Sequence, residues 1–261
     1  MSDVIFARPR HNYESYSDLW TLVELSGYPL IYIDEIDPAD ASKTYIFSTP
    51  DAETNFPHAF PGAKARIVYW LLEWYGDIVK QSGIDEVWSI NKTFAEHIGA
   101  RFVPIGSHPD LKPPEYPAHN GSTLWDIVHL SYIIPRRSKI LSELKDAGLR
   151  IAPTGWGEER HRILTHSRAM IHIHQLDGYP AIAPLRTALA AAYSLPLIAE
   201  NGWSAEPVDD VALIYKYDQL TAATRILLSS DLVENLSQLG QLLHQRLCVD
   251  KTFRHNIEAA L

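Results

Sequence analysis

Short apolar runs alternate with amphipathic segments along most of the chain, and this alternation is the feature that most constrains the fold. In the first half, runs rich in β-branched and aromatic residues predict strands at Val4–Ala7, Leu30–Ile33, Tyr45–Phe47, Arg66–Leu71 and Glu86–Ser89. Helical spacing between them predicts helices over Asp18–Leu25 and Thr93–Ile98. Strands and helices that alternate in this way are typical of a parallel sheet in an α/β protein.

The same alternation restarts after residues 106–122, a stretch with four prolines and two glycines that lacks periodic apolar spacing. We interpret this stretch as a linker between a domain of residues 1–105 and a domain of residues 123–261. In the second half the pattern predicts strands at Ile127–Ile134, Leu149–Ile151, Ala169–Ile173 and Leu195–Ala199, and helices at Arg136–Asp146, Glu158–Ser167 and Pro184–Tyr193. Residues 219–261 predict two or three helices that pack back across both halves. The expected fold is therefore α/β, with two Rossmann-like domains.

The charge balance and the cysteine count restrict the compartment and the partners. The chain carries 23 Lys and Arg against 32 Asp and Glu, a formal net charge of −9, which disfavours a broad contact with nucleic acid or anionic lipid. No apolar run approaches the ~20 residues that span a bilayer, and Met1–Pro9 lacks the features of a signal peptide. The single cysteine, Cys248, has no partner for an internal disulfide. We expect a cytoplasmic protein without a membrane span.

Arginine follows proline at the predicted start of two helices in the second half. Pro135 precedes Arg136 and Arg137, and Pro184 stands two residues before Arg186. Proline suits the first position of a helix, but a cation in the first turn faces the positive end of the helix dipole. A bound phosphate or diphosphate would interact with these arginines and with the free backbone N–H groups. The alternative is that the arginines reach outward to solvent or to acidic neighbours.

Further polar and aromatic residues follow strands at the same predicted edge, where open α/β sheets bind ligands. Gly155-Trp156-Gly157 offers an aromatic ring on which a base or sugar could stack; the alternative is a tight strand-to-helix turn with a packing tryptophan. His174 and Gln175 end one strand and Glu200 ends the next, so we expect them to contact a ligand. For Glu200 the alternative is a solvated surface carboxylate.

His172 and His174 are two residues apart on a predicted strand and therefore point to the same face. Such a pair can bind zinc, which makes a zinc-dependent hydrolase an alternative function. The sequence offers no convincing further ligands for a metal. We therefore predict no metal site, and expect His174 and Gln175 to make polar contacts to a ligand instead.

Two residues in the first half are candidates for acid–base catalysis. His11 follows the first predicted strand, and Glu73 lies among apolar residues and two tryptophans. An apolar setting would suit Glu73 to be a general base, and a carboxylate in a structural hydrogen-bond network is the alternative. The chain lacks a Gly-x-Gly-x-x-Gly motif after its first strand, a Walker-type phosphate loop and a Gly-x-Ser-x-Gly elbow. These absences disfavour a dehydrogenase, an NTPase and an esterase.

The order and spacing of these motifs resemble the group-1 glycosyltransferases of the two-domain GT-B fold, most nearly their short spore-maturation (CgeB-like) members. The resemblance covers roughly residues 85–260. The matching segments are Val103-Pro104-Ile105-Gly106, Asp126 to Tyr132, Pro135-Arg136-Arg137, Gly155-Trp156-Gly157, His172-Ile173-His174, Pro184-Leu185-Arg186 and Ala190-Ala191-Ala192. The first of these segments looks like the family's hinge between its domains.

The resemblance implies two domains that face each other across a cleft, with a nucleotide-sugar donor held mainly by the second and an acceptor by the first. It implies sugar transfer to an acceptor hydroxyl without an essential metal or cofactor, with a UDP-sugar as the expected co-substrate. The predicted donor-binding residues are Ser131, Arg136, Arg137, Trp156, Gly157, His174, Gln175, Leu185, Arg186 and Glu200. Of these, the three arginines would face the diphosphate, and His174, Gln175 and Glu200 would line the sugar and ribose. The predicted catalytic residues are Glu73 and His11.

The chain departs from the family at one informative position. Many members have glutamate where this chain has Arg186, and the Glu-x7-Glu pair of the family is absent. The sequence therefore leaves open whether transfer retains or inverts configuration. The acceptor is also open: a saccharide, a small molecule, or a modified DNA base, as in phage-type glycosyltransferases that act on hydroxymethylpyrimidines. A non-catalytic module that binds a nucleotide or a sugar phosphate is a further alternative.

Overall fold

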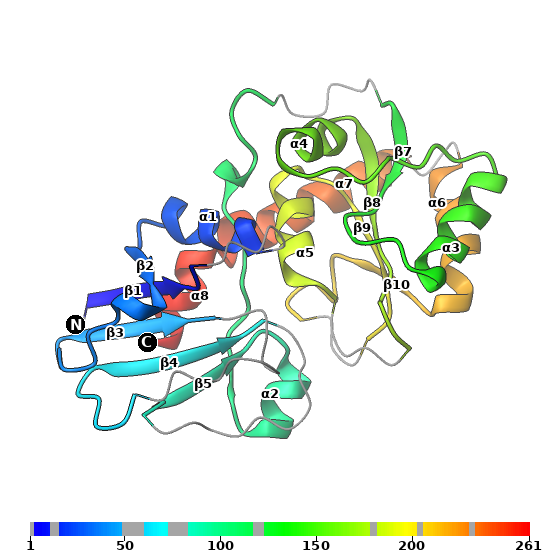
Figure 1. Ribbon diagram of the computed structural model, residues 1–261. Helices are drawn as coiled ribbons and strands as arrows, with labels where there is room; N and C mark the ends of the chain where they lie inside the picture. The colour runs from blue at the N-terminus through cyan, green and yellow to red at the C-terminus, as the bar shows by residue number, and fades with distance from the viewer. Residues whose placement is uncertain are drawn as a thin grey trace. The chain divides into compact units, whose positions relative to one another are not determined.

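The computed structural model describes residues 3–10, 16–48, 60–72, 83–116, 123–177, 182–202, 206–229 and 233–261. Contacts between Cα atoms divide the chain into two compact units. Unit 1 comprises Met1–Ile105 and Asn256–Leu261, and unit 2 comprises Gly106–His255 (Figure 1).

Unit 1 is built on a six-stranded parallel sheet. Its strands are β1 (Asp3–Arg8), β2 (Leu30–Tyr32), β3 (Lys43–Phe47), β4 (Arg66–Leu71), β5 (Glu86–Ser89) and β6 (Arg101–Phe102). They lie in the order β2-β1-β3-β4-β5-β6, with every neighbouring pair parallel. β3 and β4 are buried along almost their whole length, as expected for strands covered on both faces.

Two helices of unit 1 follow strands of this sheet, α1 (Ser17–Leu25) and α2 (Lys92–Ile98). α2 begins and ends on local signals. The Asn91 side chain accepts a hydrogen bond from the Phe94 N–H at 2.7 Å, which caps the first turn. Gly99 then ends the helix in the left-handed conformation, with φ of 67°. Phe94 packs from α2 onto the core formed by Phe47, Tyr69 and their neighbours.

Unit 2 contains a second parallel sheet. Its strands are β7 (Trp125–Val128), β8 (Ser167–His172), β9 (Leu197–Glu200) and β10 (Leu213–Tyr215), in the order β10-β9-β8-β7. Ile151 adds an isolated parallel bridge to Ile127 on the side of β7 away from β8. Counted along the chain, unit 2 therefore has the strand order 2-1-3-4-5, the same order with which the sheet of unit 1 begins.

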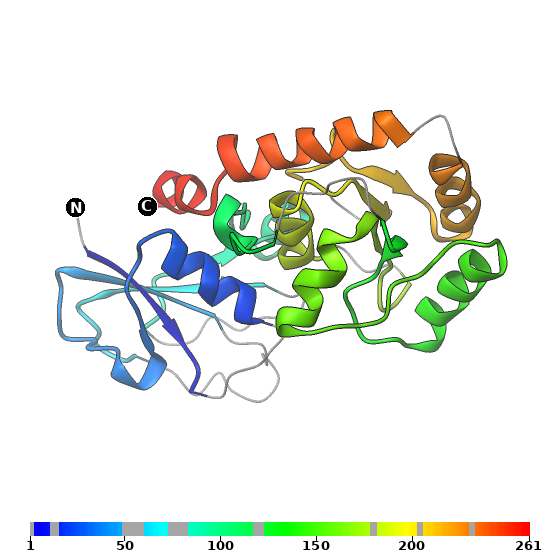
Figure 2. The same ribbon diagram turned by 90° about the horizontal axis from the view of Figure 1, so that it is seen from above.

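Helices cover both faces of the sheet in unit 2. They are α3 (Pro135–Asp146), α4 (Gly157–Thr165), α5 (Pro184–Ala192), α6 (Leu220–Leu228) and α7 (Val233–His244), which Figure 2 shows from above. The last helix, α8 (Phe253–Ala260), belongs to unit 1 from Asn256 onward. Figure 1 shows α3 and α6 on one face and α4 and α5 on the other. A Cβ atom at Gly240 of α7 would lie 2.0 Å from the Ser194 carbonyl oxygen, so glycine allows α7 to pack closely against the turn after α5.

Two sequence predictions in the second half are wrong in extent, and one strand was missed. The predicted strand Ile127–Ile134 ends at Val128, because residues after it leave the sheet and Tyr132 and Ile133 are exposed. The predicted strand Leu149–Ile151 contributes only the Ile151 bridge. β10 was not predicted, because three half-buried residues carry too short a pattern. The remaining predicted strands and helices are confirmed to within about two residues at each end.

Candidate functional site

The carboxyl ends of β7 and β8 lie next to each other where the strand order of unit 2 reverses. One connection leads from β7 to Ile151 on one side, and the next strand, β8, lies on the other side. In open α/β sheets of this order, ligands bind in the crevice at this reversal. The loop after β7 leads to α3 and the loop after β8 leads to α5. The residues of interest therefore lie in these two loops and in the first turns of the two helices.

Both helices begin without a side-chain cap. Ile134 and Ala183 occupy the cap positions of α3 and α5 and accept no hydrogen bond through a side chain, and Pro135 and Pro184 follow them. Neither helix has an acidic residue in its first turn. The first N–H groups of a helix have no partner within the helix, and they attract anions. An anion at this edge would satisfy donors that the helices themselves leave over.

Arg136 is the centre of an ion-pair network in the first turn of α3. Its Nη1 and Nη2 atoms donate to the Glu200 carboxylate at 2.7 and 2.5 Å, and its Nε donates to Asp177 at 2.8 Å. Its guanidinium carbon lies 3.8 Å from the ring centroid of Tyr217. Burial disfavours the Arg136 charge, but the bonds to the carboxylates outweigh this effect and raise the pKa of Arg136. The structure thus pairs Arg136 with Glu200, the two residues predicted to face different parts of a donor; their contacts to a donor stay predictions.

Arg137 forms hydrogen bonds to the loop after β7 and to the loop after β8. It is buried, and its Nε donates to the Ile173 carbonyl at 3.0 Å while Nη1 donates to the Tyr132 carbonyl at 3.0 Å. These bonds connect the loop after β7 to the end of β8. Ser131, also buried, lies in the loop that Arg137 holds. Arg137 therefore contributes a fixed positive charge beneath the edge of the sheet.

Arg186, in the first turn of α5, lies at the end of a chain of imidazole rings. Its Nη1 lies 3.2 Å from Nδ1 of His172, and Nε2 of His172 lies 3.3 Å from Nδ1 of His174. Nε2 of His174 lies 3.2 Å from the Asn201 carbonyl oxygen. Both histidines are buried, and burial lowers the pKa of each; the Arg186 charge lowers the pKa of His172 further. Two neutral rings therefore lie behind a half-buried arginine.

His129 is a residue of this edge that the sequence did not single out. It follows β7 and is buried, and its Nδ1 lies 3.1 Å from the Ile171 carbonyl oxygen. Its Nε2 atom is buried and has no hydrogen-bond partner among the residues that the structure describes. Burial, together with the charges of Arg186 and Arg137, lowers the pKa of His129 to about 3. A histidine inside an apolar run gave no signal of its own, because only the fold brings it beside the other two.

The Gly155-Trp156-Gly157 segment combines a tight turn with an exposed ring. Gly157 has a φ of 56°, a backbone conformation that favours glycine. A Cβ atom at Gly155 would lie 3.2 Å from the backbone nitrogen of Arg160, so the chain packs tightly there as well. Trp156 is 40% exposed, and its ring centroid lies 6.0 Å from that of Tyr132, which is 70% exposed. The glycines thus make the turn, while Trp156 and Tyr132 form an exposed aromatic pair above it.

The other predicted residues are placed as follows. Leu185 is half-buried at the second position of α5, and Gln175 is exposed just after β8. His11 and Glu73, the predicted catalytic residues, lie outside the described residues. Within the described ranges, no group of three or more His, Cys, Asp or Glu residues could hold a metal ion. In the same ranges, no helix is long and apolar enough to cross a membrane.

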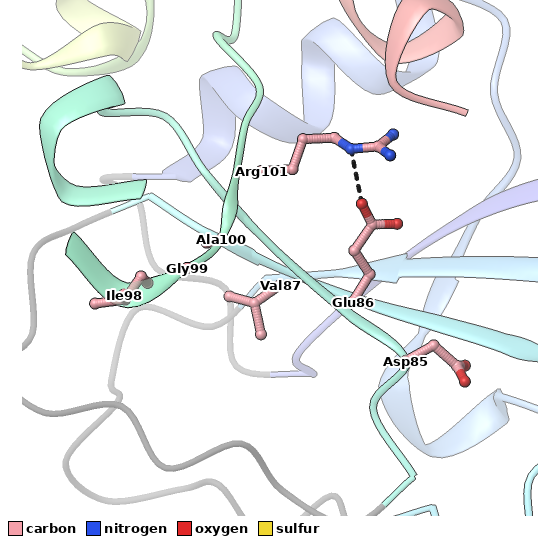
Figure 3. A pocket seen from close by; sticks show the side chains of 7 residues that line it. All are labelled: Asp85, Glu86, Val87, Ile98, Gly99, Ala100 and Arg101. Carbon is pink, nitrogen blue, oxygen red and sulfur yellow. Dashed lines mark ion pairs between the residues drawn. The ribbon is translucent and has the colours of Figure 1, made fainter. Parts of the chain in front are cut away.

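A pocket of about 490 Å³ lies in unit 1 and is lined by Asp85, Glu86, Val87, Ile98, Gly99, Ala100 and Arg101 (Figure 3). Its polar groups already bind one another: the Glu86 carboxylate accepts from Arg101 at 2.8 Å and from Arg66 at 2.5 Å. Glu86 and Arg101 are the first residues of β5 and β6. The pocket is therefore at the amino ends of these strands, whereas ligands of such sheets bind at the carboxyl ends.

Comparison of sequences finds only partial relatives. No protein-family model matches the chain. Two uncharacterized proteins of Acanthamoeba polyphaga mimivirus are similar to part of it. L140 is 26% identical over 113 residues, which are 41% of this chain and 37% of L140. L138 is 23% identical over 129 residues, which are 47% of this chain and 15% of L138. The chain thus spans well under half the length of either protein.

Comparison of structures finds glycosyltransferases that match almost the whole chain. AviGT4, a glycosyltransferase involved in avilamycin A biosynthesis, has a TM-score of 0.61 at 12% identity, over 98% of this chain and 96% of AviGT4. A mutant of T4 phage BGT in complex with UDP-glucose has a TM-score of 0.54 at 14% identity, over 99% and 97% of the two chains. A trehalose-6-phosphate synthase has a TM-score of 0.59 at 11% identity, over 96% and 79%.

Identities this low establish the fold alone. The chain has the α/β architecture with parallel sheets found in glycosyltransferases of the GT-B fold, and the predicted fold class is confirmed to that extent. The nearer resemblance to the spore-maturation type stays a prediction, as does the arrangement of two domains across a cleft.

Proposed function

We propose that the chain transfers a sugar from a nucleotide-sugar donor, a UDP-sugar in the first instance, to an acceptor hydroxyl. One observation carries this proposal. Arg186 is half-buried and its guanidinium contacts the neutral ring of His172. It lies at the edge of the sheet where α3 and α5 begin with N–H groups that no side chain caps. This is the chemistry that a diphosphate requires, and it occurs at the sheet position where α/β folds of this strand order bind ligands. The structural likeness to glycosyltransferases supports sugar transfer as the reaction.

In the proposed complex, Arg186 and the first N–H groups of α5 bind the donor diphosphate. Hydrogen bonds from arginine to phosphate are charge-assisted and short, so they are stronger than bonds between neutral groups. Arg137, fixed beneath the loops, adds positive potential without direct contact. When the bond between sugar and diphosphate breaks, negative charge develops on the leaving group. Donors that are already in place stabilise this charge without reorganising, which is the main source of catalysis expected here.

The neighbouring groups are assigned to the remaining parts of the donor. The exposed pair of Trp156 and Tyr132 offers a flat apolar surface on which the base stacks. Glu200, His174 and Gln175 are assigned to the ribose and the sugar. Because Glu200 is held by Arg136 in the free protein, its role in the complex is to keep one carboxylate oxygen fixed for a ligand hydroxyl.

The binding of the acceptor is proposed from the resemblance to GT-B glycosyltransferases. Unit 1 binds the acceptor, the two units face each other across the donor, and the helices after residue 219 pack back across both. His11 or Glu73 is the base if the reaction inverts configuration, and a retaining reaction needs neither. The protein acts in the cytoplasm and needs no metal ion, because protein donors take the place of a cation at the diphosphate.

Thermal-shift titration tests the donor site directly, because a ligand that binds only the folded state must raise the melting temperature. Purified protein is titrated with UDP, GDP, ADP and their sugar derivatives, with and without EDTA. At 100 times its Kd, one nucleotide family should stabilise the fold by about 2.7 kcal/mol, or roughly 5–10 °C for a chain of this size. Arg186→Ala should lose most of this shift.

Arg162→Ala is the matched control, since Arg162 is an exposed arginine on α4 whose Glu158 partner lies one turn away. It should keep the full shift. If no nucleotide raises the melting temperature of the unmodified protein, the proposed function is wrong. Stabilisation that disappears with EDTA would contradict the metal-independent form of the proposal.

A second assay addresses transfer itself. The stabilising nucleotide sugar is incubated with saccharides, small hydroxylated acceptors and DNA that carries hydroxymethylpyrimidines, and release of the nucleoside diphosphate is measured. Product with one class names the acceptor. Tight donor binding without release on any acceptor, and without hydrolysis, would instead favour the non-catalytic binding module.

A further inference from the structure

The contact between Arg186 and His172 has a definite hydrogen-bond direction. A guanidinium can only donate, so Nδ1 of His172, 3.2 Å from Arg186 Nη1, must accept and must carry no proton. In a neutral imidazole the proton is then on Nε2, which lies 3.3 Å from Nδ1 of His174. The His172 ring thus donates to His174, and the His174 ring donates through its own Nε2 to the Asn201 carbonyl at 3.2 Å.

A competing contact does not reverse this direction. The Ala183 N–H lies 3.4 Å from Nε2 of His172 and would need a lone pair there. If Nε2 accepted from Ala183, Nδ1 would carry the proton and would face an arginine donor at 3.2 Å. Of the three contacts of the His172 ring, the one to Ala183 is the longest. The shorter contacts to Arg186 and His174 therefore determine which ring nitrogen carries the proton.

From this chain of bonds we infer that His172 is a positioning residue, which aims the Arg186 guanidinium at the anion site, and that His174 fixes the tautomer that makes this possible. The inference rests on the proposed function, because it assigns Arg186 to a bound diphosphate. Both rings are buried, so they stay in place while Arg186, which is half-buried, meets the ligand. A neutral acceptor holds an arginine in one direction without neutralising it, whereas a carboxylate in the same place would compete with phosphate.

The surroundings of His172 keep it neutral. The charged and titratable groups that act on it are Arg186 from α5, Arg137 from α3, His174 from the same strand end and His129 from the end of β7. Two of these are permanent cations and none is an acid. Protonation of His172 would place a third positive charge among them and would remove the lone pair that holds Arg186.

Two substitutions at His172 separate the two ring nitrogens. An asparagine side chain places its oxygen near the position of Nδ1, and a glutamine side chain places its polar atoms near that of Nε2. His172→Asn therefore keeps an acceptor for Arg186, and His172→Gln removes it while keeping a partner for His174. We expect His172→Gln to weaken UDP binding by roughly 10- to 100-fold, the range typical of one hydrogen bond to a charged group, and His172→Asn to stay within about 3-fold of the unmodified protein.

The ligand and the background identify the cause of any loss. Binding of uridine, which has no phosphate, should not change in either variant, so a general loss of structure would be recognised. In the Arg186→Ala background, His172→Gln should cause no further loss of UDP affinity, because its effect passes through Arg186. Equal losses for His172→Asn and His172→Gln, or an undiminished loss in the Arg186→Ala background, would overturn the inference.

The tautomer can be measured without a substitution at all. Long-range ¹H–¹⁵N spectra of the unmodified protein should show His172 protonated on Nε2 only, and a proton on Nδ1 overturns the inference even if the variants fail to fold. If the unmodified protein binds none of the nucleotides, the proposed function fails and this inference fails with it. If UDP binds, and Arg186→Ala weakens it while His172→Gln does not, the inference alone is wrong.

Discussion

The two units differ in how far they expose an arginine that follows the first strand of their sheet. In unit 1, Arg10 follows β1, is 57% exposed, and pairs with the exposed carboxylates Asp34 and Glu35. In unit 2, the Arg136 side chain is 15% exposed and holds the nearly buried carboxylate of Glu200. Water screens the first pair and is excluded from most of the second. Arginines in the segments that follow the first strands of the two sheets are therefore mostly exposed in one unit and mostly buried in the other.

The helix starts differ in the same direction. α2 of unit 1 is capped by Asn91, and α1, which lacks a side-chain cap, has an acidic residue, Asp18, in its first turn. α3 and α5 of unit 2 have neither a side-chain cap nor an acidic residue there, and carry arginines instead. The starts of α3 and α5 thus leave positive charge at one edge of the sheet, whereas α4 of the same unit has Glu158 and Glu159 in its first turn. The difference from the helix starts of unit 1 is the reason that the proposed anion site is assigned to unit 2.

The largest expected effect comes from breaking the buried pair of unit 2. Arg136→Met leaves Glu200 as a buried carboxylate without its guanidinium partner, and we expect a loss of about 3–5 kcal/mol in the free energy of unfolding. Chemical denaturation followed by tryptophan fluorescence measures this loss. The double variant Arg136→Met with Glu200→Leu should recover much of it, because no unpaired charge remains.

The exposed pair of unit 1 supplies the control. Arg10→Ala removes a screened surface interaction and should leave the denaturation midpoint unchanged within error. If Arg136→Met and Arg10→Ala gave the same midpoint, the contrast between a buried and an exposed pair would be mistaken. An equally large loss in the double variant would indicate that packing, and not charge, explains the effect.

A smaller effect concerns a buried carboxylate at the start of the sheet in unit 2. Burial alone would raise the pKa of Asp126, but hydrogen bonds from Arg150 and Arg168 outweigh it and lower the pKa to about 2 from 3.8. Because this pKa is lower in the folded chain than in the unfolded chain, the carboxylate stabilises the fold above about pH 4, and this stability is lost as the pH falls toward 2. Protonation should remove roughly 1–2 kcal/mol.

Denaturation curves between pH 2 and pH 6 measure this effect. The stability gap between the unmodified protein and Asp126→Asn should narrow as the pH falls through this window. A constant gap for Asp126→Asn would mean that the pairing with Arg150 does not survive in solution.

Much of the fold could be predicted, because burial leaves a direct record in the sequence. β4 is buried from its second residue onward, and its last five residues form an uninterrupted apolar run, as expected for a strand that is covered on both faces. The same reasoning made the predicted strand Ile127–Ile134 too long, because Tyr132 and Ile133 are apolar and yet exposed. An exposed apolar segment that follows a strand resembles the strand in sequence, and only the fold distinguishes the two.

The candidate site could be predicted as a location but not as a network. Proline followed by arginine at two helix starts indicated the edge, since local helix physics determines that signal. The pairing of Arg136 with Glu200, 64 residues away, depends on how two strand ends meet, and no local spacing encodes it. For the same reason His129 was missed and His172 was considered only as a zinc ligand.

The smallest expected effect tests the contrast between helix starts in both units at once. Asn91→Ala removes the cap of α2 and should destabilise unit 1 by about 1 kcal/mol.

Ala183 has the extended backbone that a cap residue needs, so Ala183→Asp should stabilise α5 by about 0.5–1 kcal/mol. The same carboxylate would occupy the place proposed for the diphosphate and weaken UDP binding. Ala183→Asn adds a cap without a charge, so it should stabilise α5 and weaken UDP binding less than Ala183→Asp does. If Ala183→Asp left UDP binding unchanged, the N–H groups of α5 would not be part of the anion site, because a fixed negative charge at that helix start must repel a bound diphosphate.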